Sequence, residues 1–295
     1  MNLANITVTC FAASYGVALV LEAASLLKQT PWRRGLMLAF TAAGIFAHVA
    51  YLGLRAGAQA SPLSSPAEWC LIAALVLAAV SLAATLMAPR AATGLFLLPV
   101  VLGLIGFSLG ASDRPFAPNR AYDLWAQVHG WLLLLATVTV CLGFLAGLMY
   151  LVQSWRLKHK LLPTREFRLP SLETLQRINA HALGASAMLV AGGFGSGLVL
   201  QRLKQGAVDW RSPVTLSLAA MLVWLLAAEA FRIVYPAARR GRKVAYLTLA
   251  SFGFLLIAIA SVTLIESAHG GSRDDARPPA AEPQADGQAA EGATP

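Results

Sequence analysis

The chain has 295 residues, of which 57% are hydrophobic and 13% are charged, with a mean hydropathy of +0.63. Soluble globular proteins carry about 25% charged residues, so this composition excludes an ordinary soluble enzyme and a long disordered protein. The net charge is +9, which in so apolar a chain indicates a membrane partner and not nucleic acid. Cys10, Cys70 and Cys141 lie in apolar runs without CxxC spacing, which predicts neither a disulfide framework nor a redox motif.

Apolar stretches long enough to cross a bilayer follow one another along the chain. About 20 apolar residues span about 30 Å of hydrocarbon, and eight such stretches are separated by turn residues or charges. They cover roughly residues 5–27, 36–55, 68–88, 94–112, 124–153, 180–201, 214–235 and 244–266. They are too long and alternate too little for barrel strands. The sequence therefore predicts an all-α polytopic membrane helix bundle, formed as a single domain by residues 1–269.

The placement of Lys and Arg predicts the orientation of this bundle. With the N-terminus outside, the inner segments carry most of the basic residues, and the largest basic segment is 156–179, where Ser171 is a predicted helix N-cap. An even number of stretches then places both termini outside. We expect a multi-pass protein of the cell inner (plasma) membrane. Residues 270–295, rich in Ala, Pro, Glu and Gly, are predicted to be a disordered periplasmic tail.

Histidines are the main candidates for chemistry, because the chain has no HExxH, P-loop, GxSxG or zinc-site spacing. His129 lies near the outer end of the fifth stretch, and His269 follows the eighth stretch on the same side. Two neutral imidazoles at one depth suit the axial positions of a haem, or each is a polar anchor at the interface. His48 lies inside the second stretch, where it either faces a ligand or cavity or hydrogen-bonds across a helix interface.

Other polar or small residues inside the stretches have structural interpretations. Glu229 and Arg232 form a predicted i,i+3 pair, and Glu22, near the inner end of the first stretch, is predicted to reach towards water. The run Gly192-Gly-Phe-Gly-Ser-Gly197 has two interpretations. It either interrupts the sixth helix, as in many transporters, or gives a surface for close helix packing.

Several segments occur in the order and spacing of a known family. They are Ala47-His-Val-Ala-Tyr-Leu-Gly-Leu-Arg55, Val128-His-Gly-Trp131, Met149-Tyr-Leu-Val-Gln-Ser-Trp-Arg-Leu-Lys158, Leu169-Pro-Ser-Leu-Glu-Thr-Leu175 and Arg240-Gly-Arg-Lys-Val-Ala-Tyr-Leu-Thr-Leu249. In these segments, and over nearly the whole chain to about residue 270, the sequence resembles the HemX/CcsA-type (YpjD-like) cytochrome c assembly proteins. These are integral membrane proteins that handle haem.

The resemblance implies a set of site residues. In the family two outer histidines flank a tryptophan-rich outer loop that holds haem b, and they fall on His129 and His269 as axial ligands of the iron. A further intramembrane histidine falls on His48. The loop falls on Val208-Asp-Trp-Arg-Ser-Pro213, so that Asp209, Trp210 and Arg211 are its candidate haem-contacting residues. Only one tryptophan remains there, and Arg232 or a neighbour occupies the place of another family histidine, which favours the smaller HemX-like branch.

The function implied by the resemblance is a part in cytochrome c biogenesis. The protein would bind or present haem at the outer membrane face, with apocytochrome or other assembly proteins of the bilayer as partners, and its own side chains would do no bond-making. The alternative is a HemX-like non-catalytic membrane regulator or partner protein linked to tetrapyrrole synthesis, which binds through the basic segment 156–179. A small-molecule transporter is the third class considered.

Overall fold

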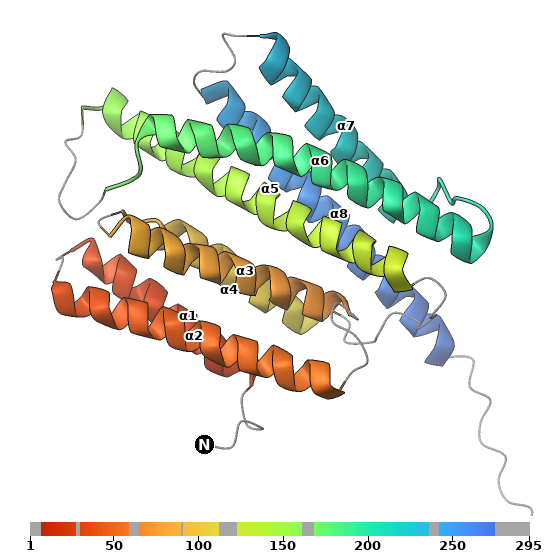
Figure 1. Ribbon diagram of the computed structural model, residues 1–295, viewed down its shortest axis with the longest axis horizontal. Coiled ribbons are helices and arrows are strands. Elements are labelled where there is room, and N and C mark those ends of the chain that lie inside the picture. The colour runs from red at the N-terminus through yellow and green to blue at the C-terminus, as the bar shows by residue number, and fades with distance from the viewer. Residues whose placement is uncertain are drawn as a thin grey trace, which may run out of the picture.

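The computed structural model describes residues 7–27, 30–58, 65–89, 91–111, 123–160, 168–235 and 242–274. Within these ranges the chain forms eight α-helices and no strand beyond one isolated bridge. The helices are α1 (Val8–Ser25), α2 (Pro31–Ala58), α3 (Pro66–Met87), α4 (Gly94–Gly110), α5 (Asp123–Lys158), α6 (Leu172–Gln205), α7 (Pro213–Val234) and α8 (Arg242–Asp274). They lie lengthwise beside one another, and successive helices run antiparallel (Figure 1).

The lengths and surfaces of the helices suit a bilayer. Seven of the described helices are long and apolar enough to cross a membrane, and α4 is a shorter apolar helix of 17 residues, about 26 Å long at 1.5 Å per residue. Large apolar side chains such as Val20, Met188 and Val223 are exposed on the bundle surface. Lipid can cover such side chains, whereas water would not. The predicted all-helical membrane bundle is therefore confirmed.

Four helices, α2, α5, α6 and α8, extend further than the predicted apolar stretches do. α5 continues to Lys158, and α6 already begins at Leu172, so the ends of the predicted basic segment 156–179 are helical. The predicted N-cap is confirmed, because the Ser171 hydroxyl accepts the N–H of Thr174 at 3.2 Å. α8 likewise runs to Asp274, beyond the start of the predicted tail at residue 270, and residues 275–295 lie outside the described residues.

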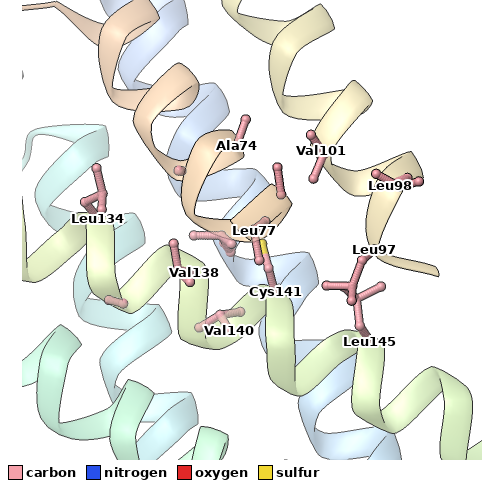
Figure 2. Packing of buried hydrophobic residues seen from close by; sticks show 14 of the residues in the cluster. Ala74, Leu77, Leu97, Leu98, Val101, Leu134, Val138, Val140, Cys141 and Leu145 are labelled. Atoms are coloured by element: carbon pink, nitrogen blue, oxygen red, sulfur yellow. The ribbon is translucent and has the colours of Figure 1, made fainter. Parts of the chain in front are cut away.

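The bundle consists of two four-helix halves. In the first half α1 packs on α2 and α4, and α3 packs on α4, while in the second half α5 packs on α6 and α8, and α7 packs on α8. The halves meet chiefly where α3 and α4 contact α5. Figure 2 shows this contact, with Leu77 of α3 beside Val138 and Cys141 of α5, and Leu97 of α4 near Leu145. One continuous apolar core therefore joins the two halves.

The two ends of the bundle differ in charge. We call the end that holds the α1–α2, α3–α4, α5–α6 and α7–α8 connections the basic end. Its described basic residues are Arg33, Arg34, Arg156, Lys158, Lys160, Arg168, Arg177, Arg232, Arg242 and Lys243. Exposed Trp32 and Trp155 lie towards the basic end, and exposed Trp125, Trp131 and Trp210 lie towards the opposite end. Exposed aromatic rings at two levels are typical of the two faces of a membrane.

Candidate functional site

His129 lies in the first two turns of α5 and is held by α6. Its Nδ1 atom is 2.8 Å from the carbonyl oxygen of Gly193 and 3.5 Å from the Ser196 hydroxyl. A carbonyl oxygen can only accept, so Nδ1 carries the proton and donates it to Gly193. The neutral ring then keeps the lone pair on Nε2, which is the atom that can bind a metal.

The glycine run of α6 gives the imidazole its space. A Cβ atom added at Gly197 would lie 2.8 Å from Cε1 of His129, and one at Gly193 would lie 2.5 Å from Cδ2 of Leu133. α6 is continuous through this run. The interpretation of residues 192–197 as an interruption of the helix is therefore wrong, and the interpretation as a close packing surface is confirmed.

Aromatic side chains lie near His129 at the same end of α5. Trp125 precedes His129 by four residues and so lies on the same helix face, and its ring is exposed. Trp131 is also exposed. Sequence reasoning did not single out Trp125 as a site residue, although the spacing Trp125-Ala-Gln-Val-His129 carries the signal of a shared face.

His269, the predicted partner of His129, lies on α8 near its C-terminal end. α8 packs against α5 and runs antiparallel to it, so the helix places residue 269 towards the same end of the bundle as His129. The side chain of His269 lies outside the described residues. The pairing of the two imidazoles stays a prediction.

The predicted loop residues form a tight turn between α6 and α7. Gly206 ends α6 in the left-handed conformation, with φ of 74°, which glycine adopts without strain. The backbone N–H of Arg211 donates to Oδ1 of Asp209 at 3.0 Å, so Asp209 holds the turn. Trp210 is 58% exposed, and Arg211 is exposed as well. Both project from the end of the bundle where α5 begins.

His48 lies in the other half of the bundle and does not join His129. It is fully buried on α2, its ring stacks on Phe11 with centroids 4.1 Å apart, and its Nδ1 is 3.4 Å from the Tyr15 hydroxyl. Its Nε2 atom is buried without a hydrogen-bond partner among the described residues. The residues of α1 fill the space against the ring, so a porphyrin at His48 requires packed side chains to move.

Two ion pairs occupy other polar positions of the helices. Arg232 donates from Nε to Oε2 of Glu229 at 2.8 Å, which confirms the predicted i,i+3 pair. Sequence reasoning missed a second pair, in which Arg55 at the end of α2 binds Glu68 at the start of α3 at 2.8 Å. Glu68 is almost fully buried, and its backbone N–H donates to the N-cap hydroxyl of Ser65. The spacing Ser65-Pro-Ala-Glu68 is a capping-box signature that could have identified the start of α3, although not the pairing with Arg55.

The prediction that Glu22 reaches towards water is wrong. Glu22 is 4% exposed, and its carboxylate accepts the backbone N–H groups of Gly94 and Leu95, the first two residues of α4. The residue before this helix, Thr93, makes no capping hydrogen bond with its side chain. The carboxylate therefore accepts N–H groups that begin α4 in place of water.

Comparison with known proteins gives no match, whether with family models, with curated proteins or with solved structures. The resemblance to the HemX/CcsA-type proteins therefore stays a prediction from the sequence segments. Among the described residues no group of three or more His, Cys, Asp and Glu side chains could hold a metal ion. A haem iron needs protein ligands only at its axial positions. Because Nδ1 of His129 donates to Gly193, its Nε2 keeps the lone pair that an axial ligand requires.

Proposed function

We propose that this protein is an integral membrane protein of cytochrome c biogenesis that binds or presents haem b at the outer face of the inner membrane, through His129 and His269. The observation that supports this most directly is the hydrogen bond from Nδ1 of His129 to the carbonyl of Gly193. Metal-ligating histidines almost always donate their second ring N–H to a carbonyl, a carboxylate or water, which fixes the tautomer and the ring orientation.

Other residues at the same end of the bundle have roles in this proposal. The Gly193 carbonyl holds the His129 ring, and the absence of a side chain at Gly197 lets the ring lie against α6. The exposed rings of Trp125 and Trp210 offer faces to a porphyrin, and the exposed guanidinium of Arg211 offers charge-assisted hydrogen bonds to its propionates. Haem, when bound, supplies the iron and the porphyrin.

The protein's own contribution is binding, orientation and presentation. We assign no catalytic residue, and the expected partners are apocytochrome c or other membrane proteins of the assembly pathway. His129 is half-buried and lies at the start of α5. A haem bound there would lie at the membrane face, where a partner outside the bilayer can receive it.

Absorbance of the purified protein tests the proposal. We expect a Soret band from wild-type protein made in haem-replete cells, and its loss in His129→Ala and His269→Ala. His181→Ala is the matched control, because His181 makes the same kind of hydrogen bond, from Nδ1 to the Arg177 carbonyl at 2.8 Å, at the basic end. A wild-type protein without a Soret band, or equal loss in His181→Ala, contradicts the proposal.

A HemX-like regulator of tetrapyrrole synthesis is the second candidate. The observation that favours it is the cluster of exposed cations where α5 ends, at Lys158 and Lys160, because such a surface suits an acidic partner protein. The test uses cells that lack the protein and that are complemented with one of two variants. The porphyrin content of these cells is then measured. Restoration by His129→Ala but not by Lys158→Gln/Lys160→Gln supports regulation, and the reverse pattern supports haem binding.

A further inference from the structure

A groove opens at the basic end where the two halves of the bundle meet. Its volume is about 540 Å³, and its lining residues are Arg34, Ala88, Pro89, Ala91, Arg168, Leu169 and Pro170. The backbone N–H of Ala92 donates to the carbonyl of Arg168 at 2.8 Å, and Ala91 and Arg168 form an isolated parallel bridge. Main-chain bonding between the halves therefore fixes two walls of the groove, and α2 supplies Arg34.

The two arginines of the groove lack acceptors among the described residues. The Nε atom of Arg34 is buried and has no hydrogen-bond partner there, and Arg168 is exposed. Buried donors in native proteins are almost always paired with protein, water or a ligand. The Nε–H group of Arg34 therefore has no acceptor among the described residues, and a bound ligand could supply one.

The described carboxylates at the basic end are engaged elsewhere. Glu22 accepts the first backbone N–H groups of α4, Glu173 pairs with Arg177 at 3.0 Å, and Glu229 pairs with Arg232. The described side chains therefore leave the positive charge of the groove uncompensated. Arg34 also lies in the first turn of α2, where the helix dipole adds further positive potential.

We propose that this groove binds a phosphate group between Arg34 and Arg168, carried by a phospholipid headgroup or by a soluble phosphorylated ligand. Arginine presents a planar fork of N–H donors that matches phosphate oxygens. One arginine lies on α2 and the other precedes α6, so the ligand must accept from both halves at once. A tetrahedral phosphate has oxygens for both forks, and the bound ligand links the two halves of the bundle.

The experiment uses full-length protein, delipidated in a maltoside detergent that contains no phosphate. One arm adds dioctanoyl-phosphatidylglycerol, with dioctanoylglycerol as its phosphate-free control, and the other arm adds inorganic pyrophosphate. Binding is measured by native mass spectrometry, and stability by thermal unfolding. We expect at least one phosphate probe to bind and to raise the unfolding temperature, because the ligand joins the halves, while dioctanoylglycerol does neither.

Variants of the lining residues decide whether the groove is the site. Arg34→Gln and Arg168→Gln should each weaken binding about tenfold, the expected effect of a lost charge-assisted hydrogen bond. Arg34→Lys, which keeps the charge but lacks Nε, should weaken it as well. Arg177→Gln is the control, because it removes the same charge at the basic end from outside the groove.

The outcomes separate the two ligand sources. Binding of the lipid alone assigns the groove to a headgroup, and binding of pyrophosphate alone assigns it to a soluble ligand. The proposal is overturned if neither probe binds, or if Arg177→Gln weakens binding as much as Arg34→Gln does. These measurements need no haem, so their failure leaves the proposed haem function untouched.

Discussion

His129 and Gly193 are joined across the α5–α6 interface by a hydrogen bond of 2.8 Å from the imidazole Nδ1 to the main-chain carbonyl. This bond connects the orientation of the imidazole with the packing of α5 on α6. It orients the ring and fixes which nitrogen is protonated, and it forms only because the glycines of α6 allow the two helices to approach closely. Packing and ligand chemistry at this end of the bundle therefore depend on the same residues.

The first prediction concerns Gly197→Ala. The added Cβ would lie 2.8 Å from Cε1 of His129, so the ring must move away from the Gly193 carbonyl. We expect a loss of about 1–3 kcal/mol in unfolding free energy from this overpacking, together with a weaker Soret band. Thermal unfolding in detergent and absorbance measure the two effects.

Gly195 provides the matched control for this variant. It lies in the same glycine run, and a Cβ there would meet nothing within 4 Å. Gly195→Ala should therefore be neutral or stabilising by up to about 1 kcal/mol, the difference in helix propensity. Equal stability and equal haem content in the two variants would show that contact with His129 is unimportant.

The second prediction concerns the cap that α1 provides for α4. Glu22→Ala removes the acceptor of the N–H groups of buried Gly94 and half-buried Leu95, and should lower the unfolding free energy by about 1–3 kcal/mol. Glu22→Gln keeps an acceptor oxygen for these N–H groups, so it should cost less than Glu22→Ala does. Unfolding of the three proteins in detergent gives these differences.

A carboxylate in the first turn of α6 serves as the control for Glu22. Glu173 is exposed and pairs with Arg177 on its own helix, so Glu173→Ala should cost no more than about 0.5 kcal/mol. If Glu22→Ala costs as little as this, the carboxylate does not cap α4.

The third prediction concerns Arg55 and Glu68. Arg55→Met removes the guanidinium that binds the nearly buried Glu68 carboxylate and should cost about 3 kcal/mol. Replacing both, as Arg55→Met/Glu68→Leu, should recover much of that loss, because an apolar pair needs no charge partner. A double-mutant cycle on unfolding measures the coupling, and strictly additive losses would mean that the two side chains do not interact.

The fourth prediction separates a structural His48 from a ligand. His48→Phe keeps the stack on Phe11 and removes the Nε2 atom that lacks a partner among the described residues. We expect the unfolding temperature to stay the same or rise, because a buried unsatisfied polar atom is lost, and the haem content to stay unchanged. Loss of haem in a stable His48→Phe protein would instead identify His48 as a ligand.

The presence and order of the helices could be predicted because each apolar run is long enough to span a bilayer. The helix ends could not be predicted in the same way. Lys158 and Glu173 are polar and lie outside the apolar runs, but they belong to α5 and α6. A helix continues as long as its main-chain hydrogen bonds form, and hydropathy does not report on those bonds.

The candidate site was predictable only in part. His129 stands out in the sequence because it is an ionisable residue at the end of an apolar stretch. Its partner Gly193 is 64 residues away and contributes a main-chain oxygen, which leaves no signal in the side-chain pattern. Glu22 was misplaced for a similar reason, because the groups that attract it are amides of α4 and not a charged side chain.

The cap on α4 also constrains how the first half can be assembled. Because the amides that begin α4 find their acceptors on α1, the shorter apolar helix completes its hydrogen bonding only when α1 is already in position. Translation delivers α1 before α4, so the order of synthesis matches the order that the cap requires. A circular permutation that placed α4 ahead of α1 would leave these amides without their Glu22 acceptor until α1 is made.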